Sequence, residues 1–282
     1  MSNKQAPTAF LCTHLAIITA RGEEAEKFLQ GQLTTDLRNL APGDNRLAMH
    51  LNLKGRAMVS MRLLRTADGY DLLTPAGMAD AVLKGLQKYA LFSKLTLSLD
   101  DRRLALGFTD AKPASDYQAW PLHSPGMPRW MALVANDTPG LDTFADASAW
   151  QALDIDAGTA HVYPGGEDLW LPQALNYDVL DGVHFNKGCF LGQEVVARMH
   201  FKGQMKQRMR AWQWPGDVVP DTGTVLRDAE GKAVGELVQA VSVDGKVKAL
   251  VVTRLDHHED LVLDGQPLNA EEVALPYSLP DK

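Results

Sequence analysis

The sequence is poor in cysteine: only Cys12 and Cys189 carry a thiol among its 282 residues. Two thiols cannot supply the four ligands of a structural zinc site, or of an all-cysteine iron–sulfur cluster, within one chain. They do not form a CxxC pair, and no two histidines have HxxxH spacing. We therefore expect no tightly bound metal, and any cluster chemistry requires a second protein.

Long apolar runs and an excess of basic residues are missing as well. No stretch approaches the ~20 apolar residues of a membrane span, and the start MSNKQAPTAF lacks the apolar centre of a secretory signal, so we expect a cytoplasmic protein. Basic residues number 28 against 35 acidic ones, and the formal charge of −7 argues against extensive nucleic-acid binding. The basic stretch from Arg198 to Arg210 is either a solvated face or a groove for an anion.

What is present is an ordinary globular composition, 45% hydrophobic and 22% charged, long enough for two or three domains. Apolar patterns predict helices at 22–31, 78–91 and 145–153, with Gly31 as a left-handed cap of the first. They predict strands at 15–19, 46–51, 57–64, 70–73, 94–99 and 130–134. Beyond Gln204, short β-rich runs between turns indicate a small barrel or sandwich. The predicted domains are 1–110, 111–204 and 205–282.

The most informative stretch is FNKGCFLGQEVVAR at 185–198. Lys187 lies two residues before Cys189, and a helix is predicted from Gln193, after the turn at Gly192. An ammonium group and unpaired helical amides both favour a thiolate, so Cys189 is a candidate reactive thiol. The alternative is a thiol that is simply buried beside Phe190.

The residues KGCFLGQEVVAR resemble the signature of the YgfZ-type folate-binding proteins. That pattern runs Lys, Gly or Ala, Cys, Tyr or Phe, any residue, Gly, Gln, Glu, three variable residues, then Arg or Lys. It is filled here by Lys187, Gly188, Cys189, Phe190, Gly192, Gln193, Glu194 and Arg198. Further landmarks resemble the family in the same order: FLQGQLTTDL at 28–37, NLKGR at 52–56, LDIDAGT at 153–159 and LPQALNYD at 171–178.

The family is similar in fold to the T protein of the glycine cleavage system. The resemblance therefore implies an α+β fold: a body of antiparallel sheets with packed helices, a C-terminal antiparallel β-barrel, and a central opening for tetrahydrofolate. It makes Cys189 the working group, assisted by Lys187, with Glu194 and Arg198 paired on one helix face as support. The candidate folate contacts are Lys54, Arg56, Gln173 and Asn176, although Lys54 and Arg56 equally suit a solvated hairpin turn.

The function implied by the resemblance is that of a tetrahydrofolate-binding accessory protein. It would support assembly or repair of iron–sulfur clusters, including those of tRNA-thiolating enzymes, through transient contacts with iron–sulfur proteins. The alternative is a folate-dependent aminomethyltransferase or demethylase-like enzyme. The acidic pair expected there aligns with Val59 and Ser60, which are poor bases, so Asp36 or Asp178 would have to replace it. A third hypothesis treats the loop as a docking epitope without chemistry.

Overall fold

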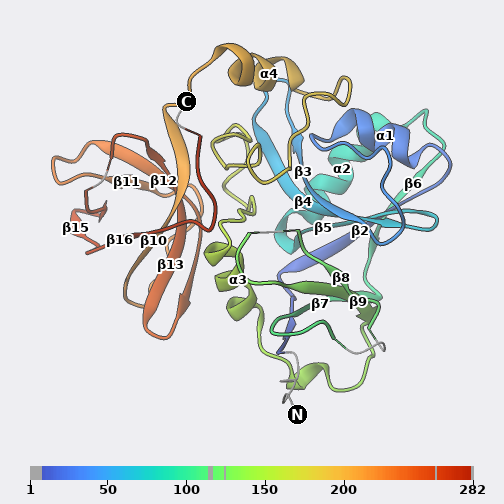
Figure 1. Ribbon diagram of the computed structural model, residues 1–282, viewed down its shortest axis with the longest axis horizontal. Helices are drawn as coiled ribbons and strands as arrows, with labels where there is room; N and C mark the ends of the chain where they lie inside the picture. The colour runs from blue at the N-terminus through green and yellow to red at the C-terminus, as the bar shows by residue number, and fades with distance from the viewer. Residues whose placement is uncertain (1–7, 114–116, 124, 258, 281–282) are drawn as a thin grey trace.

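The described part of the protein, shown as a computed structural model in Figure 1, contains three antiparallel sheets. The structure describes residues 8–113, 117–123, 125–257 and 259–280, so most of the stretch MSNKQAPTAF lies outside the described residues. Within these ranges no helix is long and apolar enough to cross a membrane.

The first sheet has the strand order β3-β4-β5-β2-β6. Its strands are β2 (Leu15–Arg21), β3 (Asn45–Leu51), β4 (Ala57–Thr66), β5 (Gly69–Pro75) and β6 (Thr96–Asp100). One face packs on α1 (Ala25–Gln32) and α2 (Ala79–Ala90), the latter preceded by the short 3-10 helix η1 (Ala76–Met78). Ile18 of the sheet, Leu29 of α1 and Leu86 of α2 are fully buried there. The apolar patterns thus predicted these strands and the two α-helices to within a few residues, but not η1.

The second sheet, with the order β1-β7-β9-β8, joins strands from both sides of residue 110. It contains β1 (Ala9–Leu11), β7 (Arg103–Phe108), β8 (Trp120–Pro121) and β9 (Trp130–Ala135), of which only β9 was predicted. The 3-10 helix η2 (Leu141–Thr143) and α3 (Ala147–Asp156) follow. Trp150 of α3 lies so close to Gly107 of β7 that a Cβ there would come within 2.3 Å of the indole. The division into three domains stays a prediction.

The C-terminal unit is a curled seven-stranded sheet with the order β15-β14-β11-β12-β13-β10-β16. Its strands are β10 (Gln207–Pro215), β11 (Val225–Arg227), β12 (Ala233–Val243), β13 (Lys246–Arg254), β14 (Val262–Leu263), β15 (Gln266–Pro267) and β16 (Glu271–Val273). The antiparallel β-rich unit is confirmed. In the described residues, however, the edge strands β15 and β16 do not pair with each other, so the sheet is not a closed barrel.

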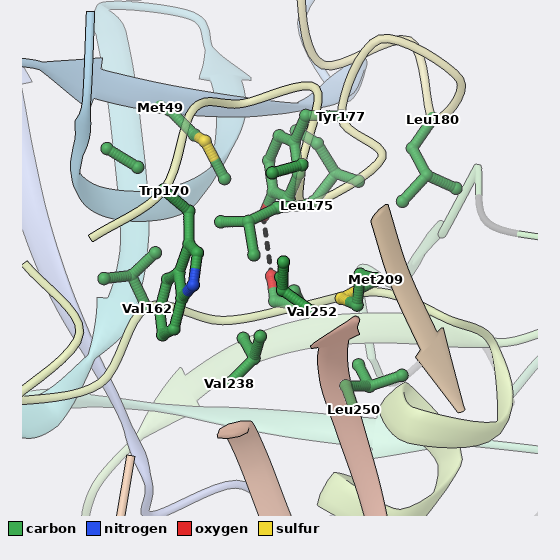
Figure 2. Close-up of a cluster of buried hydrophobic side chains, with 14 of the residues drawn as sticks. Met49, Val162, Trp170, Leu175, Tyr177, Leu180, Met209, Val238, Leu250 and Val252 are labelled. Atoms are coloured by element: carbon green, nitrogen blue, oxygen red, sulfur yellow. Dashed lines mark hydrogen bonds between the residues drawn. The ribbon is translucent and has the colours of Figure 1, made fainter. Parts of the chain in front are cut away.

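The segment from residue 160 to residue 183 fills the space between the first and third sheets without forming a strand or helix. Figure 2 shows its side chains, including Trp170 and Tyr177, between Met49 of β3 and residues of the C-terminal sheet such as Val252. Trp170 Nε1 donates to Glu236 Oε2 at 2.8 Å, and Tyr177 Oη donates to the Ala160 carbonyl at 2.8 Å. Both aromatic side chains are thus buried with their polar atoms bonded, which fixes the chain leading into the signature.

Candidate functional site

The signature continues from its loop into α4 (Gln193–Lys202), so the predicted helix start is confirmed. Gly192 precedes it with φ +78°, and a Cβ at this position would lie 2.4 Å from the Asn52 carbonyl oxygen. The Cα of Gly55, a residue at φ +73°, would lie 3.1 Å from the same Cβ. Two glycines therefore allow the 52–56 turn and the signature, distant in sequence, to touch through their backbones.

Lys187 is buried, and its ammonium group caps the end of α1. Nζ donates to the carbonyl oxygens of Gln30 and Leu33, at 2.5 Å each, and Gln30 Nε2 donates back to the Lys187 carbonyl at 3.1 Å. The last carbonyls of a helix have no partner within it, and a cation is a favourable one. The left-handed cap predicted at Gly31 is wrong, because α1 continues to Gln32 and Lys187 supplies the cap instead.

This placement differs from the expected contact of Lys187 with the thiol. The ammonium group is turned toward α1 and lies 5.0 Å from the centre of the Phe190 ring. Burial lowers the pKa of Lys187 to about 7, an effect that Asp36 opposes. Lys187 therefore holds the loop, and its assistance to Cys189 stays a prediction.

The two cysteines lie in opposite environments: Cys189 is exposed and Cys12 is buried. Burial, with a contribution from Asp154, raises the pKa of the Cys12 thiol well above its usual value. The alternative reading of Cys189 as a buried thiol is wrong. Its neighbours are anchored, because Phe190 is buried and Leu191 N donates to the Gly31 carbonyl at 3.1 Å. The thiol is thus presented to solvent on a loop fixed from both sides.

Gln173 and Asn176, predicted to contact folate, are buried braces. Gln173 Nε2 donates to the Val196 carbonyl of α4 at 2.8 Å, and Asn176 Nδ2 donates to the Met209 carbonyl of β10 at 2.8 Å. Asn176 has φ +60°, a conformation that asparagine tolerates better than most residues. The two amides therefore fasten α4 and β10 to the central segment.

Lys54 and Arg56 lie on the turn that touches Gly192. Asn52 Oδ1 accepts hydrogen bonds from the backbone amides of both, at 2.9 and 3.1 Å. The Arg56 guanidinium donates to the Leu169 carbonyl, whereas Lys54 is exposed. The ammonium group of Lys54 is thus accessible to a ligand, whereas Arg56 attaches the turn to the central segment.

The predicted ion pair between Glu194 and Arg198 is wrong. Both side chains are exposed on α4 and belong to the described residues, yet no nitrogen–oxygen contact within 4.0 Å joins them. They instead line a shallow surface hollow with Phe201 and Lys202. An exposed pair of this kind gains little, so solvation of the two side chains competes with it.

A more enclosed hollow of about 240 Å³ lies over the inner face of the first sheet. Its lining includes Asp44, Arg46, Arg62, His123, Leu180 and Asp181, and none of the four predicted folate contacts. Burial lowers the pKa of Arg62 to about 10, which leaves it charged at neutral pH, and its Nη1 donates to Asn45 Oδ1 at 2.9 Å. The sequence analysis assigned Arg62 only to the strand predicted at 57–64. An arginine within the otherwise apolar run AMVSMRLL was the signal that could have marked it as a candidate site residue.

One segment connects this hollow with the thiol loop. Asp181 lines the hollow, and its Oδ1 lies 3.1 Å from His184 Nε2, which also contacts Arg46 Nη1 at 2.7 Å. Burial is the first cause of a lowered pKa at His184, and Arg46 adds to it. Farther along, Arg38 Nη2 donates to the Asn186 carbonyl at 3.0 Å. The chain from residue 181 to residue 189 is therefore anchored along its length.

In the part of the chain that the structure describes, no three histidine, cysteine, aspartate or glutamate side chains are grouped as metal ligands.

Comparison with known proteins gives relatives over nearly the whole chain. No family model matches. The tRNA-modifying protein YgfZ of Enterobacter sp. (strain 638) is 32% identical, with 94% of this chain and 91% of the relative covered. The YgfZ proteins of Escherichia fergusonii and Escherichia coli K12 are 30% identical over the same shares. In structure, the chain is similar to the glycine cleavage system aminomethyltransferase T of Bartonella henselae, with a TM-score of 0.72, 18% identity, and 97% and 87% of the two chains covered. The T-protein-like fold is thereby shown.

Proposed function

Since the chain belongs to the family of the tRNA-modifying protein YgfZ, we propose that it supports tRNA modification as a tetrahydrofolate-binding accessory protein for iron–sulfur cluster assembly or repair. The working group in this proposal is Cys189. The observation that supports it best is the exposed thiol on a loop whose two sides are anchored by Lys187 and Leu191. A cysteine retained for packing alone would be buried, as Cys12 is.

The residues around the loop suit a thiol that meets another protein. Cys189 precedes the amino end of α4, where Gly192 leaves the first helical amides without a side-chain cap. Such amides interact favourably with an anionic group of a partner that approaches the loop. Lys187 and Gly192 keep the loop in place while Cys189 engages an oxidised or cluster-bearing partner. No resident metal is needed for that step.

The 240 Å³ hollow is the proposed position of the folate ring system. Its side chains offer carboxylates for ring nitrogens, from Asp44 and Asp181, and guanidinium groups for a carbonyl or carboxylate, from Arg46 and Arg62. Drug-sized ligands usually occupy about 300 Å³ or more, so the hollow suits the ring better than the whole molecule. Tetrahydrofolate supplies a reduced pterin that carries one-carbon units. Arg46 and Asp181 would orient it at the end of the segment that leads to Cys189.

Complementation tests the proposed function. In Escherichia coli lacking its YgfZ protein, the wild-type chain should restore thiolated nucleosides in tRNA, measured by mass spectrometry, and Cys189→Ser should not. Cys12→Ala is the matched control and should restore them. If Cys189→Ser complements fully while Arg198→Glu fails, the loop is a docking epitope without chemistry.

Folate binding is tested separately by tryptophan fluorescence during titration with tetrahydrofolate. Arg46→Ala should weaken binding about tenfold or more, because a guanidinium contact to a charged or polar group is lost. Lys54→Ala, which lies outside the hollow, is the control. Absence of binding by the wild-type protein would contradict the folate part of the proposal.

None of the four positions considered for the base of the aminomethyltransferase alternative suits that role. Val59 and Ser60 are both buried, and Ser60 Oγ accepts a hydrogen bond from Val162 N at 2.8 Å. Hydrogen bonds from Arg38 hold the pKa of Asp36 well below its usual value, so it is a weak base. Asp178 is bound by both terminal nitrogens of Arg208, at 3.0 and 2.9 Å. We expect the pure protein to form no methylene-tetrahydrofolate from a methylamine donor.

A further inference from the structure

A groove of about 390 Å³ lies beside the thiol loop and has no part in the proposed folate site. The 52–56 turn, the end of β3, α2 and the loop itself line it, and its apolar residues include Leu53, Met58, Tyr89 and Leu191. Leu53 is 78% exposed and Tyr89 43% exposed. Exposed apolar side chains gathered in one groove are typical of surfaces that bind another protein.

The charge of the groove is positive. Lys54 and Lys88 line it, and none of the described residues that line it is acidic. His50 at its base adds no charge at neutral pH, because burial lowers the pKa of its imidazole to about 4. Asp168 touches the lining from outside, through the hydrogen bond from Asn52 Nδ2 at 2.6 Å. The whole chain, by contrast, has a formal charge of −7. The two lysines are therefore a local exception on an acidic protein.

The groove also lies within reach of whatever meets Cys189. Leu191 lines it, and two residues of chain span at most about 7 Å. Phe190 between them is buried, so the chain turns its exposed cysteine and the partly exposed Leu191 away from the core. A partner segment bound in the groove would therefore place its own reactive sulfur close to the Cys189 thiol.

We propose that this groove docks an apolar, acid-flanked segment of the protein that Cys189 engages. This inference rests on the proposed function and names the chemistry of its partner. Apolar side chains of the segment would cover Leu53 and Tyr89, and its carboxylates would pair with Lys54 and Lys88. Complementary charge of this kind raises the rate of encounter and selects among partners more than it adds affinity.

Thiol–disulfide exchange with defined peptides tests the proposal. Two pentapeptides, Asp-Leu-Cys-Leu-Asp and Lys-Leu-Cys-Leu-Lys, are activated as thionitrobenzoate disulfides. The Cys189 thiolate attacks the peptide sulfur, the peptide–Cys189 disulfide forms, and thionitrobenzoate leaves and is measured by absorbance. We expect the acidic peptide to react about tenfold faster at low salt, although the net charge of the protein repels it, and the preference to fall as salt rises.

Surface variants with matched controls locate the effect. In Leu53→Glu and Lys88→Glu, the ratio of the acidic-peptide rate to the basic-peptide rate should fall to about one. Val218→Glu and Lys112→Glu, at exposed positions outside the groove lining, should retain it. Equal rates for both peptides with the wild-type protein would overturn the proposal. Added tRNA that slows the acidic peptide with wild type and not with Lys88→Glu would also overturn it, because the groove would then bind RNA.

Alkylation by neutral iodoacetamide separates this proposal from the proposed function. Cys189 should react at the same rate in all five proteins, which shows that the variants fold and keep their thiol. If Cys189 does not react with iodoacetamide, the working thiol of the proposed function fails. If it reacts normally but shows no peptide preference, only the docking groove fails.

Discussion

At the scale of single residues, the two cysteines differ in exposure, and their reactivity should differ with it. Native protein treated with iodoacetamide at pH 8 should be modified at Cys189 and spared at Cys12, as read by peptide mass spectrometry. Cys12 is 1% exposed and burial raises its pKa, so its sulfur is neither accessible to the reagent nor ionised. Unfolding in urea should make both react. Equal modification in the native state would contradict the placement of Cys12 in the core.

Lys187 gives a second prediction, on the pH dependence of stability. Its pKa is about 7 in the folded protein and near 10.4 when unfolded, so between these values the unfolded state binds more protons. The free energy of unfolding should therefore rise with pH across this window, by at most about 1.4 kcal/mol per pH unit. Lys187→Met should remove that slope in urea titrations at pH 7, 8 and 9. If the free energy of unfolding changed with pH equally in the variant and the wild type, Lys187 would not be a buried group that titrates in this range.

At the scale of elements, the start of α4 depends on Gly192. An alanine there would need φ near +78° and would place its Cβ 2.4 Å from the Asn52 carbonyl oxygen. We expect Gly192→Ala to destabilise the protein by about 2 kcal/mol or more and to accelerate amide exchange in the thiol loop. Gly188→Ala is the matched control: φ is +95°, but a Cβ meets nothing within 4 Å, so about 1 kcal/mol of conformational cost remains. Similar losses in the two variants would contradict the close contact.

Apolar runs bounded by turn residues predicted the longer elements, and the signature predicted which cysteine is available for chemistry. In the first sheet, for example, the apolar run around Leu47 and Met49 predicted β3, which is buried along most of its length. The short strands β1 and β8 were not predicted, because two or three residues are too few to show an apolar pattern. They are strands because they pair with β7 and β9, respectively. Within the site, Lys187 was assigned to the thiol by proximity in sequence. Its contacts with α1 are 157 and 154 positions away, and no local pattern predicts them.

At the scale of the whole molecule, a buried charged cluster ties the second sheet to α3 and the central segment. Arg129, which precedes β9, donates from Nη1 to Asp154 Oδ1 of α3 at 2.7 Å, and His161 Nε2 lies 3.4 Å from Asp154 Oδ2. All three side chains are less than 10% exposed. Burial alone would raise the pKa of Asp154, but Arg129 and His161 outweigh it and leave the pKa below its usual value.

Because its folded pKa is depressed, ionised Asp154 stabilises the protein above the usual aspartate pKa of about 3.9, and this contribution is lost as pH falls below it. Asp154→Asn leaves Arg129 without its buried carboxylate partner, so we expect a loss of about 3 to 5 kcal/mol in urea unfolding at pH 7. The loss should shrink toward pH 3. Asp156→Asn is the control, since its ion pair with Lys248 is partly exposed at both ends and contributes less than about 1 kcal/mol. Equal effects of the two substitutions would show that the buried cluster does not hold the sheets together.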